Sequence, residues 1–187
     1  MDKKVIVLIG MPGSGKSTVG KILAQTLGVD FVDTDRLIFE AEGMPLHDIQ
    51  TQKGMQYFIK AEEAALLSVD DTPKVVATGG SAVLCEHAMM YLSTIASIVF
   101  LDVDLNMLQK RIRDPKKRGV VLAPRQTLAG VFFERRPLYL RYADVKIRAR
   151  HTRPRDVVDV IIRKLGLDPK IKREGPAETA PDTEEKE

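Results

Sequence analysis

The chain has 187 residues, of which 44% are hydrophobic and 29% charged, and its formal net charge is +3. This length suits one globular domain with a buried core, and so small a charge gives no support to a nucleic-acid partner. No apolar run approaches the ~20 residues that span a bilayer, and the N-terminus lacks a signal-peptide apolar segment. The single cysteine excludes an internal disulfide, so we expect a cytoplasmic protein without a membrane partner.

A glycine-rich turn follows the first predicted strand, residues 3–9, and precedes a predicted helix at residues 16–27. Residues 10–18 read Gly-Met-Pro-Gly-Ser-Gly-Lys-Ser-Thr, which is the P-loop pattern of Gly, four residues, then Gly-Lys-Ser. Glycines let successive N–H groups point into one concavity at a helix N-terminus, a place that favours phosphate. Lys16 would contact the phosphates of ATP and the Ser17 hydroxyl would ligate Mg²⁺. A turn without a ligand is the alternative.

The residues of this turn that we expect to bind the nucleotide are Gly10, Pro12, Gly13, Ser14, Gly15, Lys16, Ser17 and Thr18.

Further strands and helices are predicted to alternate along the chain. The strands fall at residues 31–32, 74–78, 97–102 and 143–147. The helices fall at residues 36–42, 53–70, 86–93, 105–112, 125–141 with an interruption near Pro137, and 155–165. This alternation predicts a three-layer α/β P-loop NTPase fold, with a five-stranded parallel sheet flanked by helices. Ligands of such folds bind at the carboxyl ends of the strands.

Two segments are expected to lie outside this packed core. The polar, glycine-containing stretch around residues 112–124 predicts a mobile lid. From residue 167 to residue 187 the chain is rich in Pro, Glu, Asp and Thr, which predicts a disordered tail. Residues 1–166 would then form a single P-loop kinase domain.

Two aspartates follow the second predicted strand. Asp33 and Asp35 alternate across its end, so their side chains should point to opposite sides. One can face the metal and the phosphates while the other orients or deprotonates an attacking hydroxyl. An ordinary turn, with Asp35 capping the next helix, is the alternative.

Gly79 and Gly80 follow the third strand and would permit close approach of a ligand. The alternative is a tight turn without a ligand.

Arg118, in the predicted lid, could stabilise the transferring phosphoryl group. The alternative is a solvated run of charges. Residues 110–155 are rich in arginine, which is compatible with an RNA-binding face. However, interleaved aromatic platforms are missing, and an anionic small molecule fits better.

Taken together, these motifs resemble those of the shikimate kinases, small P-loop kinases whose five-stranded parallel sheet is similar to that of nucleoside monophosphate kinases. The resemblance extends over about residues 5–165. It rests on the P-loop, Asp33-Thr34-Asp35, Phe58 with Glu62 four residues on, Gly79-Gly80, Arg118-Gly119-Val120-Val121 (similar to an Arg-Pro-Leu-Leu lid motif) and Arg135-Arg136-Pro137-Leu138-Tyr139.

For the nucleotide, the resemblance implies that Lys16 and Ser17 serve ATP and Mg²⁺, and that Asp33 holds the metal, through water. Arg111 and Pro154 occupy the positions that sandwich the adenine ring in the family.

For the acceptor, the resemblance implies that Asp35 binds hydroxyl groups and helps to activate the one that attacks. Gly79 and Gly80 would contact the acceptor, Arg135 would pair with its carboxylate, and Arg118 would be the lid arginine. The implied catalytic residues are Lys16, Asp35 and Arg118.

Two positions depart from the family pattern. The family has an arginine directly after the phenylalanine, where this chain has Ile59, and its third glycine is Ser81 here. Lys60 does not replace that arginine, because one residue further along a helix turns the side chain about 100° away. Losing a charge-assisted bond to a carboxylate costs about 1.5–3 kcal/mol, or roughly ten- to a hundredfold in affinity.

The sequence therefore predicts a monomeric kinase that transfers the γ-phosphoryl group of ATP to a hydroxyl of a small carboxylate-bearing metabolite. Shikimate, giving shikimate 3-phosphate on the way to aromatic amino acids, is the leading acceptor. Another small hydroxy acid or amino acid, such as homoserine or gluconate, is one alternative. A catalytically inactive nucleotide-binding regulatory module is another.

Overall fold

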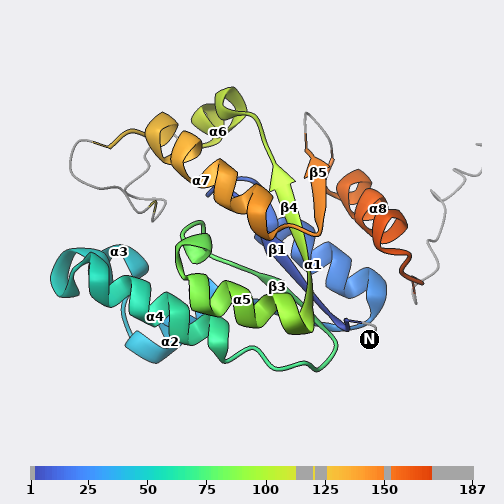
Figure 1. Cartoon of the computed structure of the whole chain (residues 1–187), viewed down its shortest axis with the longest axis horizontal. Coiled ribbons are helices and arrows are strands. Elements are labelled where there is room, and N and C mark those ends of the chain that lie inside the picture. Colours follow the sequence, from blue (N-terminus) through green and yellow to red (C-terminus); the bar gives the residue numbers. More distant parts are fainter. Residues whose placement is uncertain (1–2, 113–119, 121–125, 150–152, 170–187) are drawn as a thin grey trace, which may run out of the picture.

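The structure is a computed structural model that describes residues 3–112, 120, 126–149 and 153–169. Within these residues, parallel strands form a five-stranded sheet in the order β2-β3-β1-β4-β5. Their bounds are β1 Val5–Ile9, β2 Asp30–Asp33, β3 Lys74–Ala77, β4 Ala96–Asp102 and β5 Val145–Arg148 (Figure 1). The predicted P-loop α/β fold with a five-stranded parallel sheet is confirmed.

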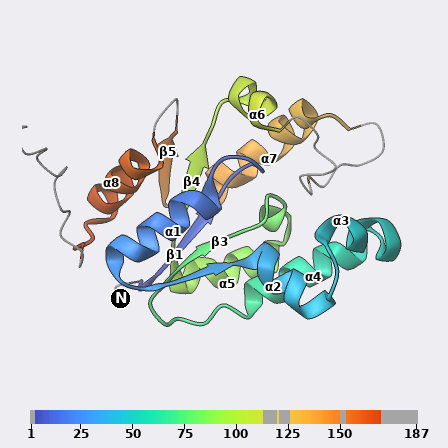
Figure 2. The ribbon, with the colours of Figure 1, turned by 180° about the vertical axis from the view of Figure 1, so that it is seen from behind.

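Helices cover both faces of the sheet. One face carries α1 (Lys16–Leu27) and α8 (Pro154–Leu165), and the other carries α5 (Glu86–Ile95) and α7 (Leu128–Tyr142), as the two opposite views show (Figures 1 and 2). The short helix α6 (Leu105–Arg111) follows β4. In the described part of the chain, no helix combines the length and apolar character needed to cross a bilayer.

A helical lobe lies at the β2 side of the sheet and has a small core of its own (Figure 1). It consists of α2 (Thr34–Glu42), α3 (Leu46–Asp48), a π-helical segment (Ile49–Lys53) and α4 (Met55–Leu67). The buried residues of its core are Ile38, Ile49, Phe58 and Ala65. The helix predicted at residues 53–70 is shorter at both ends. It begins only at Met55, because the chain turns at Gly54, where φ is +87°, and it ends at Leu67.

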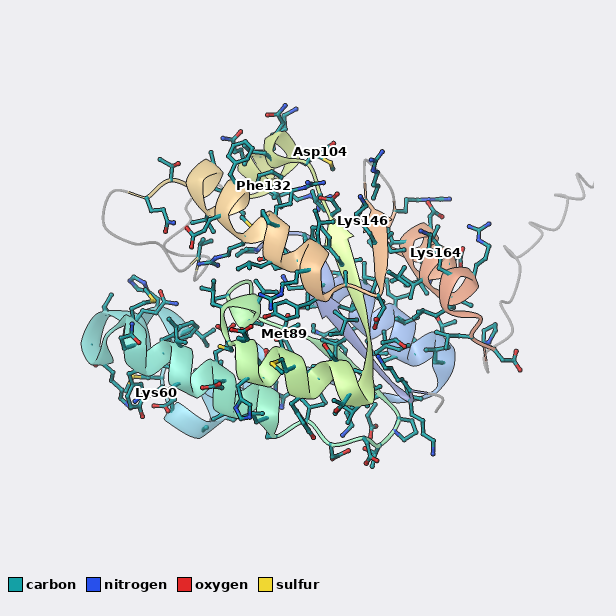
Figure 3. All side chains as sticks on the ribbon, in the orientation of Figure 1. Lys60, Met89, Asp104, Phe132, Lys146 and Lys164 are labelled. Carbon is teal, nitrogen blue, oxygen red and sulfur yellow. The ribbon has the colours of Figure 1, made fainter. Side chains whose placement is uncertain are left out.

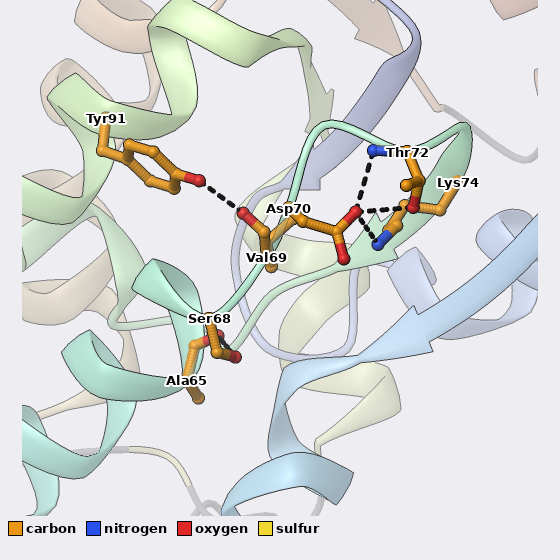
Figure 4. A network of polar contacts seen from close by, with 7 residues as sticks. All are labelled: Ala65, Ser68, Val69, Asp70, Thr72, Lys74 and Tyr91. Atoms are coloured by element: carbon orange, nitrogen blue, oxygen red, sulfur yellow. Dashed lines mark hydrogen bonds and ion pairs between the residues drawn. The ribbon is translucent and has the colours of Figure 1, made fainter.

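The connection from α4 to β3 is tied down by polar contacts (Figure 4). The Asp70 carboxylate accepts hydrogen bonds from the Thr72 amide at 2.8 Å and from the Lys74 ammonium at 2.6 Å. These donors hold the pKa of Asp70 well below its usual range. The Tyr91 hydroxyl of α5 donates to the carbonyl of Val69 at 2.7 Å, so this connection is attached to α5.

Helix α7 runs unbroken through Pro137, so the predicted interruption there is wrong. Proline removes one N–H group, which leaves the carbonyl four residues earlier, at Phe133, without its helical partner. Phe133 is 69% exposed and Pro137 also lies at the surface, so water can satisfy that carbonyl. The helix therefore continues past the proline.

The central strand β1 determines where the glycine-rich turn lies. Its five side chains are at most 4% exposed, because β1 lies between β3 and β4 and is covered on both faces. The chain leaves the sheet at Gly10, where φ is +146°. A Cβ atom there would lie 2.8 Å from the carbonyl oxygen of Leu101 at the end of β4. The turn therefore needs a residue without a side chain at this position.

We expect Gly10→Ala to lower the free energy of unfolding by about 2–4 kcal/mol, because it adds a strained φ angle to a clash with backbone that cannot move freely. Gly43→Ala is the matched control: φ is +66° there, but nothing lies within 4 Å of the added carbon. This control should lose about 1–2 kcal/mol. Denaturant titration of both variants measures the difference, and equal losses would contradict the close contact with β4.

Candidate active site

The turn between β1 and α1 forms a phosphate-sized concavity with a lysine inside it. Lys16, the first residue of α1, is 7% exposed, and its ammonium donates hydrogen bonds to the carbonyls of Gly10 at 2.8 Å and Met11 at 3.0 Å. The free N–H groups at the start of α1 favour an anion at the same place. The lysine is therefore held where a phosphate oxygen can replace the carbonyls as its partner.

A cavity of about 340 Å³ opens at the carboxyl ends of β1 and β3. The expected site residues that line it are Pro12, Gly13, Gly15, Lys16, Ser17, Thr18, Asp35, Gly79 and Gly80. Further lining residues, to which the sequence analysis gave no role, are Leu46, Phe58, Glu62, Thr78 and Ser81. The structure thus brings the P-loop and three of the expected acceptor residues, Asp35, Gly79 and Gly80, to one cavity.

A second cavity, of about 350 Å³, lies on the other side of the P-loop. Its lining includes Gly13, Ser14, Arg111 and Pro154, so the two residues expected to flank an adenine ring share one pocket. The Arg111 guanidinium also donates to the carbonyl of Gly13 at 3.1 Å, which ties α6 to the P-loop. Arg118, the expected lid arginine, and most of residues 112–124 lie outside the described residues.

Gly79 lies where the helical lobe meets the sheet. Its amide donates to the Thr34 hydroxyl at 3.1 Å, which ties the turn after β3 to α2. A Cβ atom at Gly79 would collide with Oε1 of Glu62 and would lie 3.0 Å from Oδ1 of Asp35. The glycine therefore gives both carboxylates room to reach the cavity, each from its own helix of the lobe.

Gly80 lies against the P-loop on one side and against α7 on the other. A Cβ atom at Gly80 would come within 2.5 Å of Cδ of Pro12. The Gly80 carbonyl accepts hydrogen bonds from the Arg135 guanidinium at 3.2 Å and from the Tyr139 hydroxyl at 2.5 Å. Arg135 is 2% exposed and does not itself line the cavity. It contacts Gly80, which does.

Two contacts hold α7 in place beside this turn. The Arg136 guanidinium donates to both oxygens of Asp102, at 2.9 and 3.2 Å, and this joins α7 to the last residue of β4. The Tyr139 ring stacks on Phe100 with centroids 5.1 Å apart. Arg135 directly precedes Arg136 and lies one helical turn before Tyr139, and its guanidinium is directed at Gly80.

Asp33 caps the helix that carries Asp35. Its Oδ1 accepts the Asp35 amide at 3.1 Å, so the capping residue is Asp33, and not Asp35 as in the alternative interpretation. Asp33 does not line the first cavity, whereas Asp35 and the Ser17 hydroxyl do. The described residues contain no cluster of three or more His, Cys, Asp or Glu side chains that could hold a metal. The oxygen donors of Ser17 and the nearby aspartates are few, and this suits Mg²⁺, which keeps several water ligands and binds substrate phosphates.

Glu62 is the acidic residue of the cavity that the sequence analysis left without a role. It is 0% exposed, and neither carboxylate oxygen has a hydrogen bond of good geometry within the described part of the chain. Burial raises the pKa of Glu62 to about 7, the Asp35 charge adds to the rise, and the Ser81 hydroxyl opposes it. The sequence could have predicted the burial of Glu62, because its spacing from Phe58 and Leu66 places it on the same buried face of the helix.

Helix α4 brings no basic side chain into the cavity. Ile59, at the position where the family has arginine, is partly buried and packs against the main core. Lys60 is exposed and extends from the outer side of α4 (Figure 3). The helical spacing predicted this position of Lys60. A guanidinium that does contact the glycine turn is that of Arg135, on α7.

Comparison with known proteins identifies the family. A sequence model described as shikimate kinase matches residues 12–166. A shikimate kinase of Sulfurihydrogenibium sp. (strain YO3AOP1) is 39% identical over 163 residues, which cover 87% of this chain and 98% of the relative. A shikimate kinase of Aquifex aeolicus (strain VF5) is 34% identical over 161 residues, which cover 86% and 95%.

Solved structures point to the same family as the sequence relatives. The shikimate kinase from Acinetobacter baumannii, described as in complex with shikimate, superposes with a TM-score of 0.80 at 29% identity and covers 87% of this chain and 92% of its own. The shikimate kinase from Aquifex aeolicus superposes with a TM-score of 0.76 at 34% identity, covering 87% and 96%. With its P-loop lysine, its glycine turn and its buried arginine in place, the chain belongs to the shikimate kinase family, phosphotransferases that use ATP and act on a hydroxyl group.

Proposed function

We propose that this protein transfers the γ-phosphoryl group of ATP to a hydroxyl of shikimate and so forms shikimate 3-phosphate. The observation that carries the proposal is the shared cavity, in which Lys16 faces Asp35 and the Gly79–Gly80 turn, with Arg135 behind it. The bound shikimate of the Acinetobacter relative, whose fold is superposable, supports the choice of acceptor.

On the nucleotide side, Lys16 would exchange its two carbonyl partners for phosphate oxygens, and its charge would stabilise the phosphoryl group during transfer. The pocket between Arg111 and Pro154 would take the adenine ring. Ser17 and Asp33 would hold Mg²⁺, with water between Asp33 and the ion; Mg²⁺, when bound, neutralises phosphate charge.

On the acceptor side, Arg135 would pair with the shikimate carboxylate beside Gly80. Asp35 would accept a hydrogen bond from the attacking hydroxyl and take its proton as the new oxygen–phosphorus bond forms. The bond between the γ-phosphorus and the bridging oxygen breaks, and ADP leaves. The Gly79 turn would keep the hydroxyl near the P-loop, because no side chain separates them.

The remaining parts of the proposal concern segments outside the described residues and the state of the whole protein. Residues 112–124 would form a lid that brings Arg118 to the transferring group and excludes water. Residues 1–166 would act as one domain, and residues 167–187 as a disordered tail. The protein would work as a monomer in the cytoplasm.

One observation favours a second candidate function. Ile59 leaves the acceptor site without the second guanidinium of the family, so another small hydroxy acid or amino acid, such as gluconate or homoserine, could be phosphorylated instead. The inactive regulatory module is less consistent with the site, because Lys16 and Asp35 share one cavity.

A coupled ADP-release assay with ATP, Mg²⁺ and a panel of acceptors tests the proposal. We expect saturable turnover with shikimate, and only background hydrolysis with homoserine or gluconate. Turnover confined to another acceptor would support the second candidate, and ATP binding without turnover on any acceptor would favour the regulatory module.

Arg135→Ala should raise the KM for shikimate by roughly ten- to a hundredfold, because it removes a charge-assisted bond worth about 1.5–3 kcal/mol. The KM for ATP should change little, since the second cavity does not include Arg135. Arg141→Ala, on the exposed side of the same helix, is the matched control and should behave like the parent protein. Steady-state kinetics with each substrate varied in turn measures both constants, and an unchanged KM for shikimate in Arg135→Ala would refute the assignment.

A further inference from the structure

Glu62 has a position that the transfer reaction described above does not explain. It lies three residues after Ile59 on the same side of α4 and is 0% exposed. The residue belongs to the lining of the acceptor cavity, and its Oε1 lies against Gly79 in the cavity wall. Its two oxygens lack a well-formed hydrogen bond from any described residue. A buried polar group of this kind is costly unless a ligand completes its hydrogen bonds.

We propose that Glu62 binds the acceptor as a neutral carboxylic acid, donating a hydrogen bond to it, and that ionisation of Glu62 weakens acceptor binding. The inference rests on the proposed function, because it concerns the same cavity and takes shikimate as the acceptor.

The charged groups that face Glu62 leave its carboxylate form poorly compensated. Asp35, on α2, opposes a second negative charge in the cavity. The cations facing it are Lys16, on α1, and Arg135, on α7, but Lys16 donates to carbonyls of the P-loop and Arg135 to the carbonyl of Gly80. When an acceptor carboxylate pairs with Arg135, the charge of this guanidinium is divided between Gly80, the acceptor and Glu62, and it stabilises an ionised Glu62 less. Bound acceptor therefore favours the neutral acid even more.

Two other titratable groups near Glu62, the Cys85 thiol and the Tyr139 hydroxyl, do not ionise in the same range. Burial raises the pKa of the Cys85 thiol to about 12, and burial likewise raises the pKa of the Tyr139 hydroxyl. The Ser81 hydroxyl, in the turn after β3, lowers the pKa of Glu62 but does not outweigh its burial. The pKa of Glu62, at about 7, falls in the neutral range.

Ile59 is the reason that Glu62 can behave in this way. An arginine at this position would lie within one helical turn of Glu62, where a guanidinium pairs readily with a carboxylate. Such a pair would stabilise the ionised form and lower the pKa of Glu62. With isoleucine in its place, α4 supplies an apolar neighbour, and acceptor recognition shifts from a second guanidinium to a neutral acid.

The test is the dissociation constant of shikimate, measured by titration calorimetry without nucleotide between about pH 6 and about pH 9, together with its KM in the coupled assay. Above pH 7 both constants should rise by up to about tenfold per pH unit, while kcat changes less. Glu62→Gln, which stays neutral and can still donate, should bind with nearly constant affinity. Ile59→Arg should also remove the pH dependence, because its guanidinium keeps Glu62 ionised throughout.

Two neighbouring variants serve as controls. Glu63→Gln alters the adjacent, half-exposed glutamate that lies near His87, and His47→Gln alters an exposed histidine beside the cavity residue Leu46. Both should keep the pH dependence of the parent protein.

The free energy of unfolding of the parent protein, compared with that of Glu62→Gln, should fall as the pH rises from the usual glutamate range through about 7. The reason is that Glu62 holds its proton more tightly in the folded protein than in the unfolded chain.

Shikimate binding that is independent of pH in the parent protein would overturn this inference and leave the proposed function intact. The same holds if Glu62→Gln keeps the pH dependence of the parent. Failure of shikimate to bind at any pH would overturn both.

Discussion

The active site depends on one close contact, that of the Gly79–Gly80 turn with the P-loop. Gly80 packs against Pro12 where a side chain would not fit, and its carbonyl accepts hydrogen bonds from Arg135 and Tyr139. The phosphate concavity and the acceptor cavity therefore share a wall of backbone. A phosphoryl group and a hydroxyl can approach each other there without an intervening side chain, which is the main requirement of phosphoryl transfer by positioning.

The helical lobe supplies the acceptor side of the cavity from a separate small core. Phe58 belongs to that core and lines the cavity, and Glu62 and Asp35 reach the cavity from α4 and α2. The sheet carries the P-loop and the glycine turn, whereas the lobe carries two carboxylates of the cavity, Asp35 and Glu62. Residues of α4, such as Ile59 and the buried Glu62, can therefore vary without altering the phosphate cradle.

Local patterns were sufficient to predict the P-loop, the five parallel strands and the meeting of Lys16, Asp35 and the glycine turn, because these follow from strand order and glycine spacing. Two features depended on tertiary surroundings instead. Pro137 does not interrupt α7, because the carbonyl it leaves unpaired is at the surface, and the raised pKa of Glu62 comes from burial that spacing along the chain does not reveal. The roles of all the predicted site residues, Lys16, Asp35 and Arg135 among them, remain predictions.

A crystal structure of the chain with bound shikimate tests most directly whether the two halves of the cavity meet around the acceptor. We expect the shikimate carboxylate to lie against Arg135 beside Gly80, one ring hydroxyl to lie within hydrogen-bond distance of Asp35 and face the P-loop, and Glu62 to contact the acceptor. A complex in which the carboxylate binds Lys16 instead, or in which the hydroxyl on Asp35 faces away from the P-loop, would contradict the proposed arrangement.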